Sequence, residues 1–274
     1  SEPTPSLSMV EPVDAVFIGS TSPSGILERS VSAVVYLVRR AFQLGAGIVI
    51  IDTTGWVSGE GGRQLKLAKA DAITPSLIVG VEKSEELEHL LRYWEKLYRV
   101  VRVEPAVELR ARSRDERYTI RGDIYRRWFR DAEERLFNIE DYAYANSLLF
   151  TGKAIDRDEL EEYSRSIGRR VLHGEVVEDR VLLVVEGEAG GKPEGMGRVQ
   201  LVGLENLRNL LVSFRSREKR FLGLGILLDV DFEGWKLRVL TSVKPGEPSV
   251  VEFGNIKVSP ETFQEEGWVQ RWSF

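Results

Sequence analysis

The sequence contains no cysteine and only two methionines and two histidines in 274 residues. Without cysteine, disulfides and thiolate zinc sites are excluded, and His89 and His173 are too few and too isolated for an imidazole metal cluster. The scarcity of labile side chains, with abundant Arg, Glu and Val, is typical of proteins adapted to heat. We therefore expect a thermostable protein from a thermophile, which concerns its stability and not its function.

The sequence also lacks long apolar runs and an excess of basic residues. No apolar stretch approaches the roughly 18 to 20 residues that span a bilayer, and residues 1–5 show neither the basic start nor the apolar stretch of a secretory signal. We therefore expect an intracellular, cytoplasmic protein with no membrane partner. The formal net charge of −5 argues against a broadly basic surface, although a local basic patch still acts within about 8 Å.

Continuous apolar strands alternate with amphipathic helices in the first part of the chain. The predicted strands are 15–19, 47–52, 76–81 and 99–103, and the predicted helices are 26–44, 59–72 and 84–97. This alternation is typical of a parallel sheet covered by helices on both faces. An Arg-rich segment, predicted to be helical from 113 to about 137, follows.

The second part of the chain reads as short strands with frequent glycine. The predicted strands are 181–186, 198–203, 223–231, 236–242 and 250–258, a pattern that indicates a mostly β domain. The sequence therefore predicts an α/β domain over residues 1–147 and a β-rich domain over residues 148–274.

An apolar strand runs into the sequence Asp-Thr-Thr-Gly-Trp at residues 52–56. Open α/β sheets bind ligands beyond the carboxyl ends of their strands, where an aspartate such as Asp52 can hold Mg²⁺, often through water. The backbone N–H of Gly55 can meet the terminal phosphate of a nucleotide. The alternative is an ordinary tight turn capped by Asp52, which any α/β protein offers several times.

Two neighbouring features add to this motif. Trp56 follows the turn directly, where a nucleobase could stack on it, a contact worth about 1 to 3 kcal/mol; alternatively, its ring covers the sheet edge. The loop 19–25 offers hydroxyl and N–H groups ahead of a helix, which is a natural phosphate site. Helix capping by Ser or Thr is the commoner use of such residues and is compatible with that interpretation.

Arginines gather between residues 110 and 130, interrupted by three acidic side chains: Arg110, Arg112, Arg114, Arg117, Arg121, Arg126, Arg127 and Arg130. An ion-paired, solvated helix is the usual explanation. The alternative is a mobile lid whose guanidinium groups neutralise a phosphoryl group during its transfer, an effect worth on the order of 10³ to 10⁵ in rate.

A Walker A loop, G-x-x-x-x-G-K-[ST], does not occur in the sequence. The Gly-Lys pairs at 152–153 and 191–192 both lack the first glycine, because Ser147 and Glu186 stand in its place.

Taken together, these residues resemble the polynucleotide 5′-hydroxyl kinase family, whose archaeal and eukaryotic members phosphorylate RNA or DNA ends in tRNA and ribosomal RNA processing. The likeness extends nearly from end to end, in the family's order. It comprises a Thr-Pro clasp at residues 4–5, Thr-Ser-Pro at 21–23, the motif at 52–56, an Arg-rich lid at about 110–137 and a β-rich C-terminal domain. Ser6 departs from the glycine that usually follows the Thr-Pro of the clasp.

The resemblance implies ATP-dependent phosphorylation of the 5′-hydroxyl end of RNA or DNA, with ATP and Mg²⁺ as cofactors. It implies a P-loop-kinase-like sheet and catalytic roles for Arg121, Arg126 and Asp52, with Asp52 holding Mg²⁺ through water. The terminal nucleotide would be bound by Thr4, Pro5, Thr21, Ser22 and Trp56, and the phosphates by Thr54, Gly55 and Arg117.

In this family the P-loop precedes the clasp. The resemblance therefore implies a fragment that starts after the P-loop and does not phosphorylate alone. The sheet would then lack its first strands, and we expect a missing segment or a second chain to cover the apolar edges. The alternative is a naturally P-loop-less, non-catalytic nucleotide-binding or scaffolding subunit of an RNA-processing complex, which the sequence upstream of Ser1 would distinguish.

Overall fold

The computed structural model describes residues 10–107, 113–189, 197–270 and 274. The chain forms two compact units, Ser22–Arg112, here called the α/β unit, and Ser1–Thr21 with Ser113–Phe274, here called the β-rich unit. The Arg-rich helix therefore groups with the β-rich part of the chain. The predicted boundary at residue 147, as a boundary between independently folding domains, stays a prediction.

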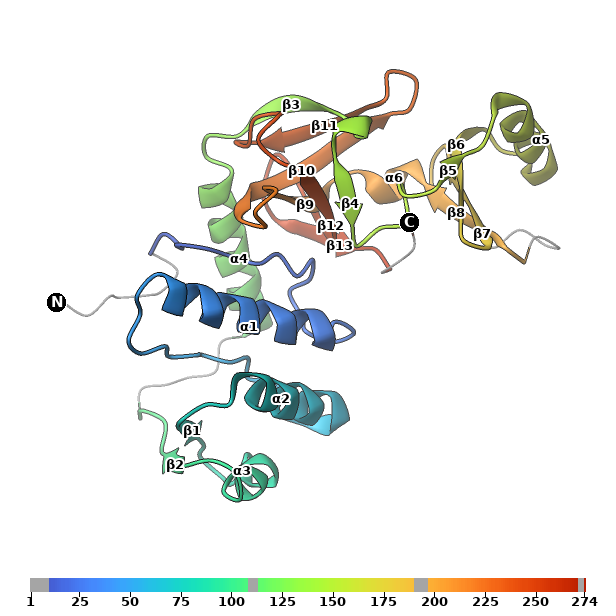
Figure 1. Ribbon diagram of the computed structural model, residues 1–274. Helices are drawn as coiled ribbons and strands as arrows, with labels where there is room; N and C mark the ends of the chain where they lie inside the picture. Colours follow the sequence, from blue (N-terminus) through green and yellow to red (C-terminus); the bar gives the residue numbers. More distant parts are fainter. Residues whose placement is uncertain (1–9, 108–112, 190–196, 271–273) are drawn as a thin grey trace. The chain divides into compact units, whose positions relative to one another are not determined.

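The α/β unit contains three helices and a short parallel sheet (Figure 1). Its elements are α1 (Leu27–Gln43), α2 (Gly59–Ile73), β1 (Ile78–Val81), α3 (Glu88–Trp94) and β2 (Val100–Val103). β1 and β2 pair in parallel, with Val79 opposite Val101, and α1 packs against α2. These elements confirm the three predicted helices and the predicted strands 76–81 and 99–103, but α1 and α2 follow each other with no strand between them.

Two predicted strands are not formed as regular strands. Residues 47–52 are not assigned to a sheet, and the side chains of Ile48 and Ile50 are 84% and 91% exposed. A strand needs a neighbour to satisfy its backbone groups, and within the described residues this run has none. Residues 15–19 belong to the β-rich unit, where the carbonyl of Gly19 accepts a hydrogen bond from the N–H of Asn255.

The β1–β2 sheet is covered on one face only by the described residues of its unit. Gly80 faces α3 so closely that a Cβ there would lie 2.8 Å from Leu91. On the opposite face, Val79 and Val101 are 51% and 38% exposed. Because parallel sheets are normally buried on both faces, this apolar face, called here the valine face, is unusual for a finished sheet.

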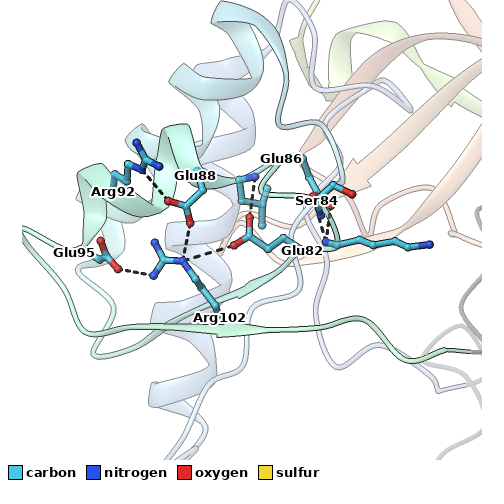
Figure 2. A network of polar contacts seen from close by, with 9 residues as sticks. Glu82, Ser84, Glu86, Glu88, Arg92, Glu95 and Arg102 are labelled. Carbon is cyan, nitrogen blue, oxygen red and sulfur yellow. Dashed lines mark hydrogen bonds and ion pairs between the residues drawn. The ribbon is translucent and has the colours of Figure 1, made fainter.

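Ion pairs tie β2 to α3 on the covered side (Figure 2). The Nε atom of Arg102 lies 2.6 Å from Glu88 and 3.6 Å from Glu82, and its guanidinium also pairs with Glu95. Glu88 additionally pairs with Arg92 at 2.9 Å. Hydrogen bonds from Arg102 and Arg92 lower the pKa of Glu88 to about 2.

The β-rich unit is built from two sheets (Figure 1). The elements in chain order are α4 (Arg114–Trp128), β3 (Glu133–Asn138), η2 (Ile139–Asp141), β4 (Ala143–Ala145), β5 (Lys153–Ala154), α5 (Arg157–Ile167), β6 (Val171–Val177), β7 (Arg180–Val185), β8 (Val199–Gly203), α6 (Leu204–Leu207), β9 (Leu210–Arg215), β10 (Phe221–Asp231), β11 (Lys236–Thr241), β12 (Val250–Val258) and β13 (Glu265–Trp268). The larger sheet has the order β13-β12-β9-β10-β11-β3, with β4 parallel to β12, and the smaller one is β5-β6-β7-β8. All five predicted C-terminal strands are present.

The main core joins the two sheets of this unit. Phe137, Phe214 and Phe253 from the larger sheet pack in one buried cluster with Leu182 and Val184 of β7. The rings of Phe137 and Phe214 stack at 4.8 Å. Burial of this apolar surface, at roughly 25 cal/mol per Å², is the main force that holds the unit together.

The Arg-rich helix is shorter than predicted. α4 begins with a capping box between Ser113 and Glu116 and ends at Trp128, and residues 133–138 form β3 instead of continuing the helix. Tyr125 of α4 and Phe129, which follows the helix directly, are buried in a second cluster of the larger sheet. The carboxyl half of α4 is therefore anchored to this sheet.

Candidate functional site

The strand-end motif forms an exposed loop in the α/β unit. The backbone and side chains of Asp52, Thr53, Thr54 and Gly55 are exposed, and Trp56 is half-buried. The loop leads directly into the first turn of α2. This placement leaves the candidate ligand groups accessible.

Trp56 is fixed by glycines at the start of α2. A Cβ at Gly61 would lie 2.7 Å from the edge of the Trp56 ring, and one at Gly62 would lie 3.2 Å from the Trp56 carbonyl oxygen. Real Cβ atoms do not approach so closely, so glycine at position 61 lets the ring lie against the helix. The ring orientation is thus set by α2 and does not depend on a ligand.

Lys66 is the principal residue that the sequence analysis missed. It lies on α2, is only 6% exposed, and its Nζ donates a hydrogen bond to Thr53 Oγ1 at 2.6 Å and another to the carbonyl of Thr54. Burial and the nearby charge of Lys69 lower the pKa of Lys66 to about 8, against the opposing effect of Asp52. The loop therefore has a buried cation behind it.

A cavity of about 620 Å³ lies beside the same loop. Its lining residues are Val57, Ser58, Gly59, Glu60, Arg63, Glu86 and His89. His89 Nε2 lies 2.9 Å from the carbonyl oxygen of Val57, and Arg63 donates a hydrogen bond to the carbonyl of His89. The volume falls in the range of roughly 300 to 1,000 Å³ that is usual for ligand pockets, and the cavity begins one residue after Trp56.

The loop 19–25 holds its hydroxyl groups near the surface. Thr21 and Ser22 are both exposed, and Ser22 Oγ accepts a hydrogen bond from the N–H of Ser24 at 3.3 Å. α1 has its N-cap at Ile26, which makes no side-chain capping bond. The N-cap residue of α1 therefore makes no capping bond itself, and phosphate binding by the hydroxyls of this loop stays a prediction.

The arginines of α4 have different surroundings. Arg121 makes two hydrogen bonds to Glu265 of β13, at 2.6 and 2.8 Å, and these raise its pKa. Arg126 is exposed and pairs with Asp123 one turn earlier. Arg117 is also exposed. Arg126 and Arg117 are thus exposed, whereas Arg121 is less exposed and is held by Glu265.

The predicted site is divided between the two units. Asp52, Thr54, Gly55 and Trp56 lie together in the α/β unit, and Arg117, Arg121 and Arg126 lie together on α4 of the β-rich unit. Thr21 is the last residue of the first segment of the β-rich unit, and Ser22 is the first residue of the α/β unit. Thr4 and Pro5 lie outside the described residues. A joint site made by these groups stays a prediction.

Asp52 is the carboxylate that the sequence predicts to hold Mg²⁺. Among the described residues, no three His, Asp or Glu side chains gather into a metal cluster. Mg²⁺ is commonly bound by one or two carboxylates together with phosphates and water. Asp52 is exposed and follows no strand, next to the Thr53 and Thr54 oxygens that Lys66 contacts. Its role as a Mg²⁺ ligand stays a prediction.

Comparison with known proteins decides the family. Residues 1–131 match the family model described as mRNA cleavage and polyadenylation factor CLP1 P-loop. A polyribonucleotide 5′-hydroxyl-kinase of Pyrococcus horikoshii is 31% identical over 268 residues, covering 97% of this chain and 73% of that protein. The chain belongs to the polyribonucleotide 5′-hydroxyl-kinase family. A relative of the same name from Pyrococcus furiosus is 30% identical over 269 residues, covering 97% and 74%.

Membership of the polyribonucleotide 5′-hydroxyl-kinase family confirms the resemblance carried by the Thr-Ser-Pro, Asp-to-Trp and Arg-rich motifs. The mixed α/β fold with a β-rich C-terminal part is confirmed as well. A solved structure of Clp1p with Pcf11p aligns over 84% of this chain and 52% of that chain, at 13% identity and a TM-score of 0.48. Within the described residues of this family member, no helix is both long and apolar enough to cross a membrane.

Proposed function

We propose that this protein catalyses ATP-dependent phosphorylation of the 5′-hydroxyl end of RNA or DNA in RNA processing. The observation that carries the proposal is the exposed Asp52-to-Trp56 loop, held from behind by Lys66, in a chain whose relatives are named polyribonucleotide 5′-hydroxyl-kinases. ATP and Mg²⁺ are the cofactors, because phosphoryl transfer from a nucleotide needs a cation that bridges the phosphates. ATP supplies the phosphoryl group when it is bound.

The loop supplies the anion-binding side of the site. Asp52 would hold Mg²⁺ through water, and the backbone N–H of Gly55 with the hydroxyl of Thr54 would bind the transferring phosphate. Preorganised N–H and hydroxyl groups stabilise a charge that develops in the transition state without reorganising during the reaction.

The terminal nucleotide binds at Trp56 and the neighbouring loop. The edge of the half-buried Trp56 ring lies against Gly61, and a base would stack on the ring. The exposed hydroxyls of Thr21 and Ser22, and the clasp residues Thr4 and Pro5, grip the same nucleotide. The cavity beside His89 gives room for the next nucleotide.

The helix α4 supplies the cations that neutralise the charge of the phosphates, namely Arg117, Arg121 and Arg126. Guanidinium groups suit this role because they stay charged at every physiological pH and offer several donors in a fixed geometry. Arg126 and Arg117 are already exposed. Arg121 must leave Glu265, which is why its pairing there matters for the mechanism.

The nucleotide-holding half of the site lies on a P-loop segment, or on a second chain, that packs against the valine face. The sequence of this chain contains no Walker A loop, so other residues must cradle the ATP phosphates. The half-exposed valines of β1 and β2 offer the apolar surface that such a segment needs.

The test uses the protein expressed from its complete gene, radiolabelled ATP, Mg²⁺ and an RNA oligonucleotide with a 5′-hydroxyl end. Transfer of label to the RNA is expected, with losses of about 100-fold for Asp52→Asn and Arg126→Ala. Arg157→Ala on α5, an exposed arginine paired with Glu161, is the matched control and keeps normal turnover. Absence of transfer, with retained binding of oligonucleotide, would instead support the non-catalytic scaffolding alternative.

A further inference from the structure

Lys66 is a buried cation to which the proposed reaction assigns no chemical role. Lysine is almost never fully buried unless it is paired, and a buried charge costs free energy unless hydrogen bonds compensate it. Lys66 nevertheless lies on α2 with only 6% of its surface exposed. Lys66 lies directly behind the Asp52-to-Trp56 loop, and contacts with this loop would account for a lysine at this buried position.

The ammonium group holds two consecutive residues of the loop. Nζ donates to Thr53 Oγ1 at 2.6 Å and to the Thr54 carbonyl. The negative charge of Asp52 favours the protonated form of Lys66, although burial acts against it. Lys66 therefore interacts with both the backbone and the carboxylate of the motif.

The bond to the Thr54 carbonyl also fixes the following N–H group. The peptide unit is planar and trans, so the carbonyl of Thr54 and the N–H of Gly55 point in opposite directions. A carbonyl that is drawn toward α2 by Lys66 directs the Gly55 N–H to the other side of the loop, away from α2.

We propose that Lys66 is a positioning residue, which locks the Thr54–Gly55 peptide so that the Gly55 N–H faces the transferring phosphate. Its ammonium also places a fixed positive charge behind that phosphate. The inference rests on the proposed function for its chemical meaning, but the orientation of the peptide is independent of any activity. A merely structural Lys66 would tie α2 to the strand end without affecting the reaction.

Lys66→Met tests the proposal, because methionine keeps an unbranched stem of similar length and removes the charge and the donors. In the protein from the complete gene, turnover of a 5′-hydroxyl RNA should fall at least about 10-fold, while the KM for the RNA stays within about twofold. Lys69→Met is the matched control: Lys69 lies on the same helix, and burial also lowers its pKa, but turnover should be normal.

Two readouts separate this inference from the proposed function. A crystal structure of Lys66→Met should show the Thr54–Gly55 peptide rotated, and hydrogen exchange at the Gly55 amide should change; both are measured without RNA or ATP. An inactive wild type with this rotation refutes the proposed function and leaves the positioning role intact. An active wild type, with full turnover and an unrotated peptide in Lys66→Met, overturns the inference.

Thr53→Val is the second test variant, to be used if Lys66→Met does not fold. Thr53 is exposed, and valine keeps its shape while removing one acceptor of Lys66. Turnover should fall about 2- to 13-fold, by the loss of one hydrogen bond of roughly 0.5 to 1.5 kcal/mol. Wild-type turnover together with an unchanged hydrogen-exchange rate at the Gly55 amide would overturn the role of the Thr53 bond in positioning the loop.

Discussion

Arg121 donates two hydrogen bonds to the carboxylate of Glu265, at 2.6 and 2.8 Å, across 144 residues of sequence. The hydroxyl of Tyr118 adds a bond to the backbone carbonyl of Glu265 at 3.1 Å. The middle of α4 is thereby tied to β13. A guanidinium that already holds a carboxylate in this two-pronged geometry offers a phosphate the same geometry. If Arg121 acts on the phosphates as proposed, Glu265 competes with them for Arg121.

Glu265→Gln should raise turnover if Arg121 acts on the phosphoryl group. The neutral amide accepts only one of the two bonds and carries no charge, so Arg121 is released more readily. We expect turnover to rise about 2- to 5-fold, since a charge-assisted hydrogen bond is worth roughly twice a neutral one. Steady-state kinetics with Glu266→Gln as the control, a neighbour that accepts instead from Asn209, checks this. If Arg121→Ala also turns over normally, Arg121 is structural.

Gly61→Ala should weaken RNA binding through Trp56. The added Cβ would lie 2.7 Å from the ring, so the indole must move away from the helix and out of its stacking position. Because base stacking is worth about 1 to 3 kcal/mol, the affinity for a labelled oligonucleotide should fall about 5- to 100-fold, as it should for Trp56→Ala.

The same substitution separates binding from helix stability. Alanine in a helix is more favourable than glycine by roughly 0.5 to 1 kcal/mol, so a loss of affinity in Gly61→Ala cannot come from weakening α2 alone. Gly47→Ala is the control, because nothing lies within 4 Å of a Cβ at that position. Unchanged fluorescence anisotropy titrations for both Gly61→Ala and Trp56→Ala would exclude stacking.

Lys66 should make stability rise with pH in the alkaline range. Its pKa is lowered from 10.5 to about 8 in the folded protein, so between these two values the unfolded chain binds more protons. The cost of burying the charge is therefore fully present below about pH 8 and disappears as the pH rises to about 10.5. The shift corresponds to roughly 3 kcal/mol at most.

Chemical unfolding of the wild type and Lys66→Met at several pH values from 7 to 10.5 measures this difference. The free energy of unfolding of the wild type should increase relative to that of the variant over this range. Parallel curves for the two proteins would show that Lys66 loses no proton on folding in this range.

The sequence predicted the elements whose pattern is local and missed those whose partners are distant. The strand at Val250–Val258 was predicted with its bounds, because valine, phenylalanine and isoleucine recur along the whole segment. β3 was predicted as helix, because its Arg- and Glu-rich composition also suits a solvated helix. Its strand pairing comes from β11, where Leu237 lies opposite Phe137, and no pattern within residues 133–138 contains that information.

The candidate site shows the same limit. The motif at 52–56 was found because an apolar run, a turn sequence and an aromatic residue are contiguous, although the apolar run does not form a regular strand. Lys66 was missed because a lysine on an amphipathic helix normally points to solvent, and only the fold reveals that it is buried. Glu265 was missed because nothing near it in sequence indicates a contact with Arg121.

The valine face gives the last prediction, which concerns what completes the sheet. Val79 and Val101 lie opposite each other on neighbouring parallel strands and are half-exposed among the described residues. If a P-loop segment or a second chain packs on them in the intact protein, Val79→Lys buries an uncompensated charge there. Thermal unfolding of the protein from the complete gene should then show a melting temperature several degrees lower, and turnover should fall with it.

Val176→Lys is the matched control, because Val176 also lies on a strand and is comparably exposed. Its side chain stays in solvent, so its substitution should leave the melting temperature within about a degree, as is usual for surface positions. If Val79→Lys behaves like Val176→Lys, the valine face is open to solvent in the intact protein. The nucleotide-holding residues must then pack elsewhere, and the two-strand sheet is complete as it stands.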